Sequence, residues 1–118
     1  MSAELDNWVE RYRLAWTTND ADDIRALFTE DATYRTEPFA DPWVGHDAIV
    51  AGWAGAADEP GRWNFEWVPL VDAGAVRVIT ATTTYAAGEV YSNLWVIRLA
   101  DDGRATEFTE WWMEQAAG

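Results

Sequence analysis

The sequence predicts an α+β fold in which three N-terminal helices pack on a strongly curved, mainly antiparallel sheet. Two observations lead to this prediction. Apolar residues recur at helical spacing only in the first half of the chain, whereas period-two alternation and turn residues dominate the second half. A chain of 118 residues can bury one core, so we expect a single domain over residues 1–118.

The first predicted helix spans Ala3 to Thr18. Its apolar side chains repeat every three to four residues, which places them on one face of a helix. The stripe is formed by Leu5, Trp8, Val9, Tyr12 and Trp16. We expect this face to pack on the sheet.

The second predicted helix begins after a break at Asn19 and ends near Asp31. Asp20 is a good N-cap, because its side-chain oxygen can accept hydrogen bonds from the first-turn N–H groups. Its buried face consists of Ile24, Leu27 and Phe28. A short strand, Thr33 to Thr36, follows because its residue types suit a pleated sheet.

A third, shorter helix is predicted after a loop. Pro38 and Pro42 frame the loop, since proline interrupts both helices and strands. Gly45 precedes the helix, whose apolar residues are Ile49, Val50 and Trp53. The run from Asp58 to Gly61 has the composition of a turn.

Four long strands are predicted in the second half. The first alternates Trp63, Phe65 and Trp67 with polar residues, and the others span Val76 to Tyr85, Val90 to Leu99 and Arg104 to Met113. Turn residues separate them at positions 72–74, 86–88 and 101–103. Such a sheet, with helices on one face, can curl around an internal pocket.

Composition excludes several classes of function. The formal net charge of −13 disfavours nucleic-acid binding and repels anionic membranes. The absence of cysteine excludes disulfides and thiolate chemistry. We expect a cytoplasmic protein, since no signal peptide and no membrane-spanning apolar run is evident. Phosphate-loop, serine-nucleophile and metal-binding patterns are also missing, so we expect no cofactor and no metal.

The order of the segments resembles a known family. Trp8 to Ile49, Tyr91 to Trp95, the turn at Gly103 and Glu107 to Trp112 resemble the nuclear transport factor two-like superfamily, in particular its SnoaL-like and ketosteroid isomerase-like branches. The resemblance implies a cone-shaped barrel with a deep cavity between the helices and the sheet. It also implies frequent homodimers, but the fold alone does not choose a function.

The catalytic groups of ketosteroid isomerase are only partly present. That enzyme, a worked example of pKa tuning, uses an aspartate base with a tyrosine and a protonated aspartate as oxyanion donors. The resemblance places Tyr12 at the position of the oxyanion tyrosine. It places Thr36 at the position of the aspartate base, with Glu37 next in the sequence, and Trp95 at the position of the protonated aspartate. A threonine hydroxyl is not a base near neutral pH without a partner. The sequence therefore argues against steroid isomerisation by that mechanism.

The same register predicts an aromatic pocket. Alternation along the last two strands, fixed by the turn at Gly103, directs one set of side chains inward. Glu110 lies between two of these rings, where desolvation should raise the pKa of a carboxyl toward a range useful for acid–base catalysis. We expect Glu110 and Tyr12 to be catalytic and the pocket to be lined by Tyr34, Thr36, Trp53, Tyr91, Asn93, Trp95, Phe108 and Trp112.

For several polar residues a structural role is an alternative to a role in catalysis or binding. Glu110 itself would point to solvent if the strand slipped by one residue. His46, the single histidine, is expected to cap or pack locally, because no ligand cluster accompanies it. An epoxide hydrolase would need an arginine between two carboxylates, so Arg77 or Arg98 would have to face inward.

Three classes of function remain open. The first is a cofactor-free isomerase, cyclase or hydrolase that acts on a small apolar cyclic molecule through Glu110 or Glu37. The second is a non-catalytic binding protein for such a molecule, which the few inward polar groups favour. The third is an association domain whose cavity is filled by its own side chains. Nine tryptophans favour the first two, because a small core seldom needs so many large rings.

Assembly is predicted from the surplus of rings. Trp63, Phe65, Trp67 and Trp111 are more large side chains than one small cone should bury. We therefore expect a homodimer through the outer face of the sheet, with several of these rings in the interface.

Overall fold

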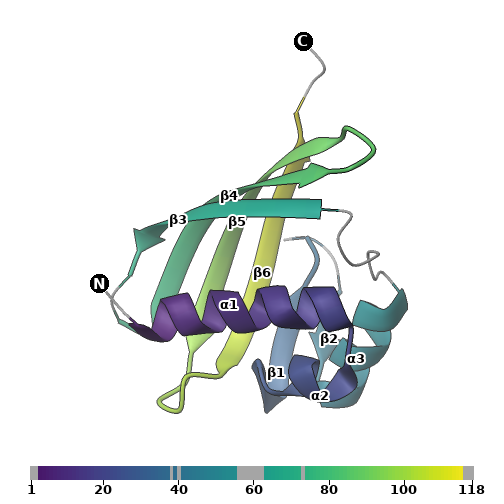
Figure 1. The fold of residues 1–118 in the computed structure, drawn as a ribbon. Coiled ribbons are helices and arrows are strands. Elements are labelled where there is room, and N and C mark those ends of the chain that lie inside the picture. Colours follow the sequence, from purple (N-terminus) through teal and green to yellow (C-terminus); the bar gives the residue numbers. More distant parts are fainter. Residues whose placement is uncertain (1–2, 38, 40, 56–62, 73, 116–118) are drawn as a thin grey trace.

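Figure 1 shows the computed structural model, which describes residues 3–37, 39, 41–55, 63–72 and 74–115. Within these residues the helices are α1 (Ala3–Thr18), α2 (Ala21–Arg25) and α3 (His46–Gly55). The strands are β1 (Phe28–Arg35), β2 (Trp43–Val44), β3 (Trp63–Val71), β4 (Val76–Tyr85), β5 (Val90–Leu99) and β6 (Ala105–Glu114). The predicted α+β class, with helices packed on a mainly antiparallel sheet, is confirmed.

The strands form one curved, unclosed sheet in the order β2-β1-β6-β5-β4-β3. Strands β3 to β6 are antiparallel neighbours, whereas β1 runs parallel to β6. Helix α1 crosses one face of this sheet, and α2 and α3 lie beside β1 and β2 (Figure 1). We call the face covered by α1 the inner face and the opposite one the open face.

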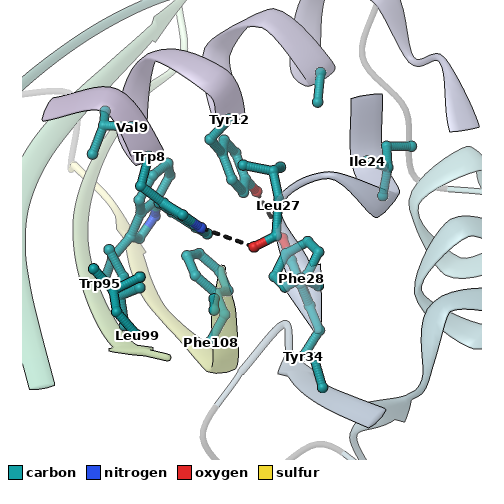
Figure 2. Packing of buried hydrophobic residues seen from close by; sticks show 14 of the residues in the cluster. Trp8, Val9, Tyr12, Ile24, Leu27, Phe28, Tyr34, Trp95, Leu99 and Phe108 are labelled. Atoms are coloured by element: carbon teal, nitrogen blue, oxygen red, sulfur yellow. Dashed lines mark hydrogen bonds between the residues drawn. The ribbon is translucent and has the colours of Figure 1, made fainter. Parts of the chain in front are cut away.

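The core lies between α1 and the inner face and consists largely of aromatic rings. Trp8 stacks on Phe108 with ring centroids 5.6 Å apart and meets Trp95 edge to face at 6.3 Å (Figure 2). Its indole N–H also donates a hydrogen bond of 3.0 Å to the Leu27 carbonyl. Because that N–H is paired, Trp8 can be buried completely without leaving an unsatisfied donor.

The second helix is shorter than predicted. The Asp20 side chain does cap it by accepting bonds from the backbone N–H groups of Asp22 and Asp23, but α2 ends at Arg25. Phe28 begins β1 instead of continuing the helix, because it pairs with Ala105 of β6 and the Ala105 N–H donates to the Leu27 carbonyl at 2.8 Å. This parallel pairing joins segments far apart in the sequence, so local helical spacing did not reveal it.

The predicted third helix is confirmed as α3, with Trp53 on its buried side. The loop before it contains the two-residue strand β2, which pairs with β1 through Thr33↔Val44 and Tyr34↔Trp43. Pro38 lies outside the described residues, as do positions 58–61 and Ala73, where turns were predicted.

The rings of β3 face the opposite way from the prediction. Phe65 is only 2% exposed and stacks on Trp95 at 4.8 Å, and Trp63 stacks on Trp16 of α1 at 3.8 Å. Trp67 is also packed against the core. These three rings therefore belong to the inner face and are not available for an interface on the open face. Of the four rings predicted there, Trp111 alone lies on the open face, where it is 48% exposed.

Candidate functional site

Most rings predicted to line a pocket pack directly on one another. Tyr12 lies 4.4 Å from Trp95 and 4.9 Å from Trp53 between ring centroids, and Tyr34 lies 4.7 Å from Phe108. All five side chains are 7% exposed or less. They pack together under α1, in the region where the resemblance predicts a cavity.

Tyr91, Asn93, Glu110 and Trp112 lie where the inner face extends past α1. The β4–β5 hairpin and the C-terminal part of β6 project beyond this helix at the top of Figure 1. In the β5–β6 register Trp95 is opposite Glu110 and Asn93 is opposite Trp112. Asn93 is buried, Glu110 and Tyr91 are half-buried, and Trp112 is 45% exposed. This end of the inner face therefore combines polar groups with accessible rings.

A chain of hydrogen bonds positions the Glu110 carboxylate. Its Oε2 atom accepts one bond from Asn93 Nδ2 at 2.8 Å and another from Trp95 Nε1 at 3.1 Å. Asn93 Oδ1 in turn accepts a bond of 2.7 Å from the Thr83 hydroxyl. An ionised carboxylate can only accept hydrogen bonds, so the nitrogen of the Asn93 amide must be the atom that faces Glu110 Oε2. We call these four residues the Glu110 network.

The sequence analysis missed Thr83. It is 2% exposed and pairs with Tyr91 across the β4–β5 ladder. The alternation of β4 could have identified it, because Ile79, Ala81 and Thr83 are all buried on the inner face. A threonine in a row of apolar residues signals a polar partner on the neighbouring strand, since a buried hydroxyl requires one.

Two buried tyrosines lie beneath the network. The hydroxyl oxygens of Tyr12 and Tyr34 are 2.7 Å apart and share a hydrogen bond. Burial is the largest cause that raises the pKa of each phenol above its usual value, and the negative charge of Glu110 raises both further. Both hydroxyls therefore remain protonated and neutral across the physiological pH range.

Three rings border the network on its exposed side. Tyr85 and Tyr91 meet at 5.6 Å with planes 89° apart, and Tyr91 and Trp112 meet at 5.6 Å with planes 73° apart. We call them the ring shelf. In both pairs the edge of one ring meets the face of the next, so the three rings contact one another in sequence.

Three other candidates do not join the site. Thr36 and Glu37 lie in the bend after β1, and Glu37 is exposed. His46 Nε2 lies 2.8 Å from the Phe28 carbonyl oxygen, which makes it a local contact between α3 and β1. Among the hydrogen bonds of the described residues, none joins Thr36 or His46 to the Glu110 network.

Arg77 does lie between two carboxylates, but away from Glu110. Its guanidinium is 3.3 Å from Asp72 and 3.5 Å from Glu4, and it donates to the Gly74 carbonyl at 2.7 Å. These contacts tie the start of α1 to the turn between β3 and β4. Arg98 is exposed and pairs with Glu107 at 2.7 Å. The carboxylate partners of Arg77 and Arg98 are thus residues other than Glu110, so neither arginine forms a carboxylate–arginine–carboxylate set with Glu110.

The open face carries a groove of about 690 Å³ across β3, β4 and β5, lined in part by Val68, Thr80, Thr82 and Leu94. Exposed apolar side chains flank this groove, namely Val68 and Leu70 of β3 and Trp111 and Met113 of β6. Within the described part of the chain, no group of three or more histidine or acidic side chains is placed to hold a metal ion. No helix in that part is sufficiently long and apolar to cross a membrane.

The sequence matches one family model. The model is that of the SnoaL-like domain, and it matches residues 9–108. This range runs from the middle of α1 to the first residues of β6 and thus includes Thr83, Asn93 and Trp95, whereas Glu110 lies two residues beyond it. No functionally curated protein matches the sequence.

Solved structures share the fold at low sequence identity. An NTF-2-like protein of unknown function from Burkholderia xenovorans LB400 has a TM-score of 0.75 and 13% identity, covering 98% of this chain and 87% of its own. A steroid delta-isomerase from Pseudomonas aeruginosa has a TM-score of 0.66 and 17% identity, covering 99% and 83%. SalBIII, an epoxide hydrolase/cyclase-like enzyme in pyran ring formation in the polyether salinomycin, has a TM-score of 0.71 and 16% identity, covering 92% and 89%.

Proposed function

Because this chain belongs to the SnoaL-like domain family, we propose that it binds a small apolar cyclic molecule on the ring shelf and acts on it by cofactor-free acid–base chemistry. Glu110 is the proton-transferring group in this proposal. The reaction class is isomerisation, cyclisation or hydrolysis, each of which can proceed by moving protons at a bound ring. The names of the structural neighbours, which include an isomerase and a cyclase-like enzyme, are compatible with it.

One observation carries the proposal: the Glu110 carboxylate is oriented by two donors at the edge of an aromatic surface. Asn93 and Trp95 both bind Oε2, so the orientation of the side chain is fixed before a ligand arrives. A general base needs a defined position relative to the proton that it removes. Proximity to apolar rings also limits hydration, which strengthens electrostatic interactions with a bound molecule.

Tyr12 supports the site from below in this proposal. Its hydroxyl is bonded to Tyr34 and its side chain is buried, so direct contact with a ligand on the shelf is not the role that we assign to it. Its ring packs on Trp95 at 4.4 Å and holds the indole that donates to Glu110. Tyr12 is therefore a positioning residue, and Glu110 is the catalytic one.

A second candidate function is non-catalytic binding of the same class of molecule. It is favoured by the dense ring packing under α1, which leaves the site only the polar groups of the Glu110 network. In that case the network would orient the ligand without transferring a proton. Both candidates place the ligand on the ring shelf, so they differ only in whether chemistry follows binding.

Solvent isotope exchange separates the two candidates. The protein is incubated in D₂O with cyclic ketones of one to four rings, and deuterium next to the carbonyl is measured by mass spectrometry. General-base catalysis commonly contributes about 10²–10⁴-fold in rate, so we expect Glu110→Gln to slow exchange at least 100-fold. Glu107→Gln, on the same strand but exposed, is the control and should match wild type. Equal exchange by wild type and Glu110→Gln for every ketone would exclude the catalytic proposal.

We also propose a homodimer formed through the open face. The support is an apolar surface that includes Val68, Leu70, Trp111 and Met113, each exposed in the single chain. Exposed apolar side chains of this kind are favoured in an interface, because association removes them from water. The interface differs from the predicted one, since Trp63, Phe65 and Trp67 face inward.

A further inference from the structure

Two indole rings form a parallel stack where α1 ends and β3 begins. The ring centroids of Trp16 and Trp63 are 3.8 Å apart, their planes are 14° apart, and both side chains are half-buried. The indole nitrogen of Trp63 is shielded from solvent, and no described residue accepts a hydrogen bond from it. We call the two rings the indole stack. A buried donor without a partner is rare in folded proteins and requires a physical explanation.

We infer that the indole stack is a gate, which separates to admit the ligand to the inner face beneath α1. This inference rests on the proposed function, because it names the route by which the ring molecule reaches Glu110. Two arguments support it. One is the balance of energies in the closed stack, and the other is the set of contacts that lies behind the stack.

The closed stack carries opposing contributions to its free energy. Contact between aromatic rings favours it by roughly 2- to 13-fold beyond the area that the rings bury. The unpartnered N–H of Trp63 disfavours it by roughly 5- to 150-fold, because water can bond to this donor only after the ring moves. These contributions are of similar size and opposite sign. The stack can therefore open at small cost while the rest of the protein stays folded.

The contacts behind the stack lead to the Glu110 network. Phe65 is 2% exposed, and its ring centroid lies 5.6 Å from that of Trp16 and 4.8 Å from that of Trp95. Trp95 in turn donates a hydrogen bond to Glu110. The β3 ring of the stack is also opposite Tyr85 of the ring shelf in the β3–β4 register. Opening the stack would therefore expose Phe65 and give a ligand on the shelf access to the rings around Glu110.

Hydrogen exchange of the indole N–H groups tests the inference in the full-length protein without a ligand. The Trp95 side chain is 1% exposed and its N–H is bonded to Glu110, whereas the Trp8 N–H is bonded to the Leu27 carbonyl. Exchange in D₂O is followed by NMR at low concentrations of urea. We expect Trp95 to exchange at least about tenfold faster than Trp8, at a rate that urea hardly changes, because a gate opens without global unfolding.

The decisive variant carries benzothienylalanine at position 63. This residue has nearly the shape of tryptophan but has sulfur in place of the N–H, so it removes the unpartnered donor and keeps the stack. We expect exchange at Trp95 to slow at least about fivefold, because the closed stack loses its penalty. Ketone exchange should slow by the same factor, since only molecules with an open gate admit the ketone. Trp16→Ala removes the other ring and should accelerate exchange at Trp95 at least about twofold.

Benzothienylalanine at position 111 is the matched control. The Trp111 side chain is 48% exposed on the open face, so it is already in contact with water and lies outside the proposed route. This variant should match wild type both in the exchange rate at Trp95 and in ketone exchange. Urea unfolding of each variant establishes that it is folded before rates are compared.

Two results would overturn the inference. One is exchange of Trp95 and Trp8 at the same rate and with the same urea dependence, which would mean that the inner face opens only on unfolding. The other is a rate of Trp95 exchange, or of ketone exchange that depends on Glu110, that benzothienylalanine at position 63 leaves unchanged. Failure of the proposed function looks different: no ketone would exchange deuterium in a Glu110-dependent manner, while local opening at Trp95 would still be observed and slowed by the variant.

Discussion

The hydroxyl groups of Tyr12 and Tyr34 share a hydrogen bond inside the core. Neither phenol can ionise easily there, because burial and the charge of Glu110 both raise its pKa. An unfolded tyrosine has a pKa near 10. The folded state thus binds more protons than the unfolded state above pH 10, and folding stability must fall as pH rises through that range.

We predict that this loss can be measured by urea unfolding at pH 8, 10 and 11. The free energy of unfolding should fall by about 1.4 kcal/mol per buried tyrosine by pH 11. The eight basic side chains are all arginine, which stays protonated in this range, so lysine does not obscure the effect. The double variant Tyr12→Phe with Tyr34→Phe should show a flatter pH dependence. An equally steep fall in the double variant would mean that other groups cause it.

Sequence alternation placed Glu110, Asn93 and Trp95 on one face, and the β5–β6 ladder does pair Trp95 with Glu110. The turn at Gly103 does not by itself fix this register, because the ladder shifts by one residue between the pairs Leu99↔Ala105 and Arg98↔Glu107. Alternation could not show that Asn93 and Trp95 share one carboxylate oxygen, since that depends on side-chain rotamers. It also could not show that Tyr12 contacts Tyr34 and not a ligand. The positions of site residues were thus predictable, but their partners were not.

At the scale of single elements, α3 shows how one glycine shapes the packing. A Cβ atom on Gly52 would overlap the indole of Trp43, closer than real Cβ atoms approach their neighbours. The Trp43 ring is stacked on Tyr34 at 4.9 Å, so it is held between the helix and β1. Gly52 therefore allows α3 to approach the sheet closely, although glycine lowers the intrinsic helix propensity.

We predict that Gly52→Ala destabilises the protein in spite of its better helix propensity. Overpacking typically costs about 1–3 kcal/mol, which exceeds the propensity gain of about 1 kcal/mol. Gly55→Ala is the matched control in the same helix, because a Cβ there meets no described atom within 4 Å. It should be neutral or stabilising in urea unfolding. A stabilising Gly52→Ala would show that Trp43 moves aside without cost.

Element types were predictable where the periodicity was long and local, as in α1, whose bounds Ala3–Thr18 agree with the prediction. The prediction failed at Leu27 and Phe28, where parallel pairing with β6 overrides helical spacing. It also failed for the orientation of β3. Alternation shows that Trp63, Phe65 and Trp67 share a face, but which face depends on the stacking partner in α1, which the sequence does not reveal.

At the scale of the whole molecule, α1 covers part of one face of the sheet, whereas the other face exposes apolar side chains. Val68 and Leu70 of β3 and Trp111 and Met113 of β6 lie at opposite sides of the groove on the open face. A second copy of the chain, related by two-fold symmetry, would cover both patches at once. The inner-face site would remain accessible, because it lies on the other side of the sheet.

We predict a dimer of about twice the 13.3 kDa chain mass in light scattering at micromolar concentration. Trp111→Lys should shift it toward monomer, because it places a charge in the apolar interface. Leu14→Lys, at an exposed position of α1, should leave the mass unchanged. A monomeric wild type would contradict the proposed dimer but leave the inner-face site untouched.

The central claim is that a ligand binds on the inner face beside Glu110, and the indole N–H signals in a ¹H–¹⁵N NMR spectrum test it most directly. Single Trp→Phe variants assign the signals, and the protein is titrated with the ring ketone that exchanges fastest. The account predicts shifts for Trp95, which donates to Glu110, and for Trp112 on the ring shelf, with Trp8 and Trp111 unchanged. Shifts confined to Trp111, which is exposed on the open face, would place the ligand on the other side of the sheet and contradict the account.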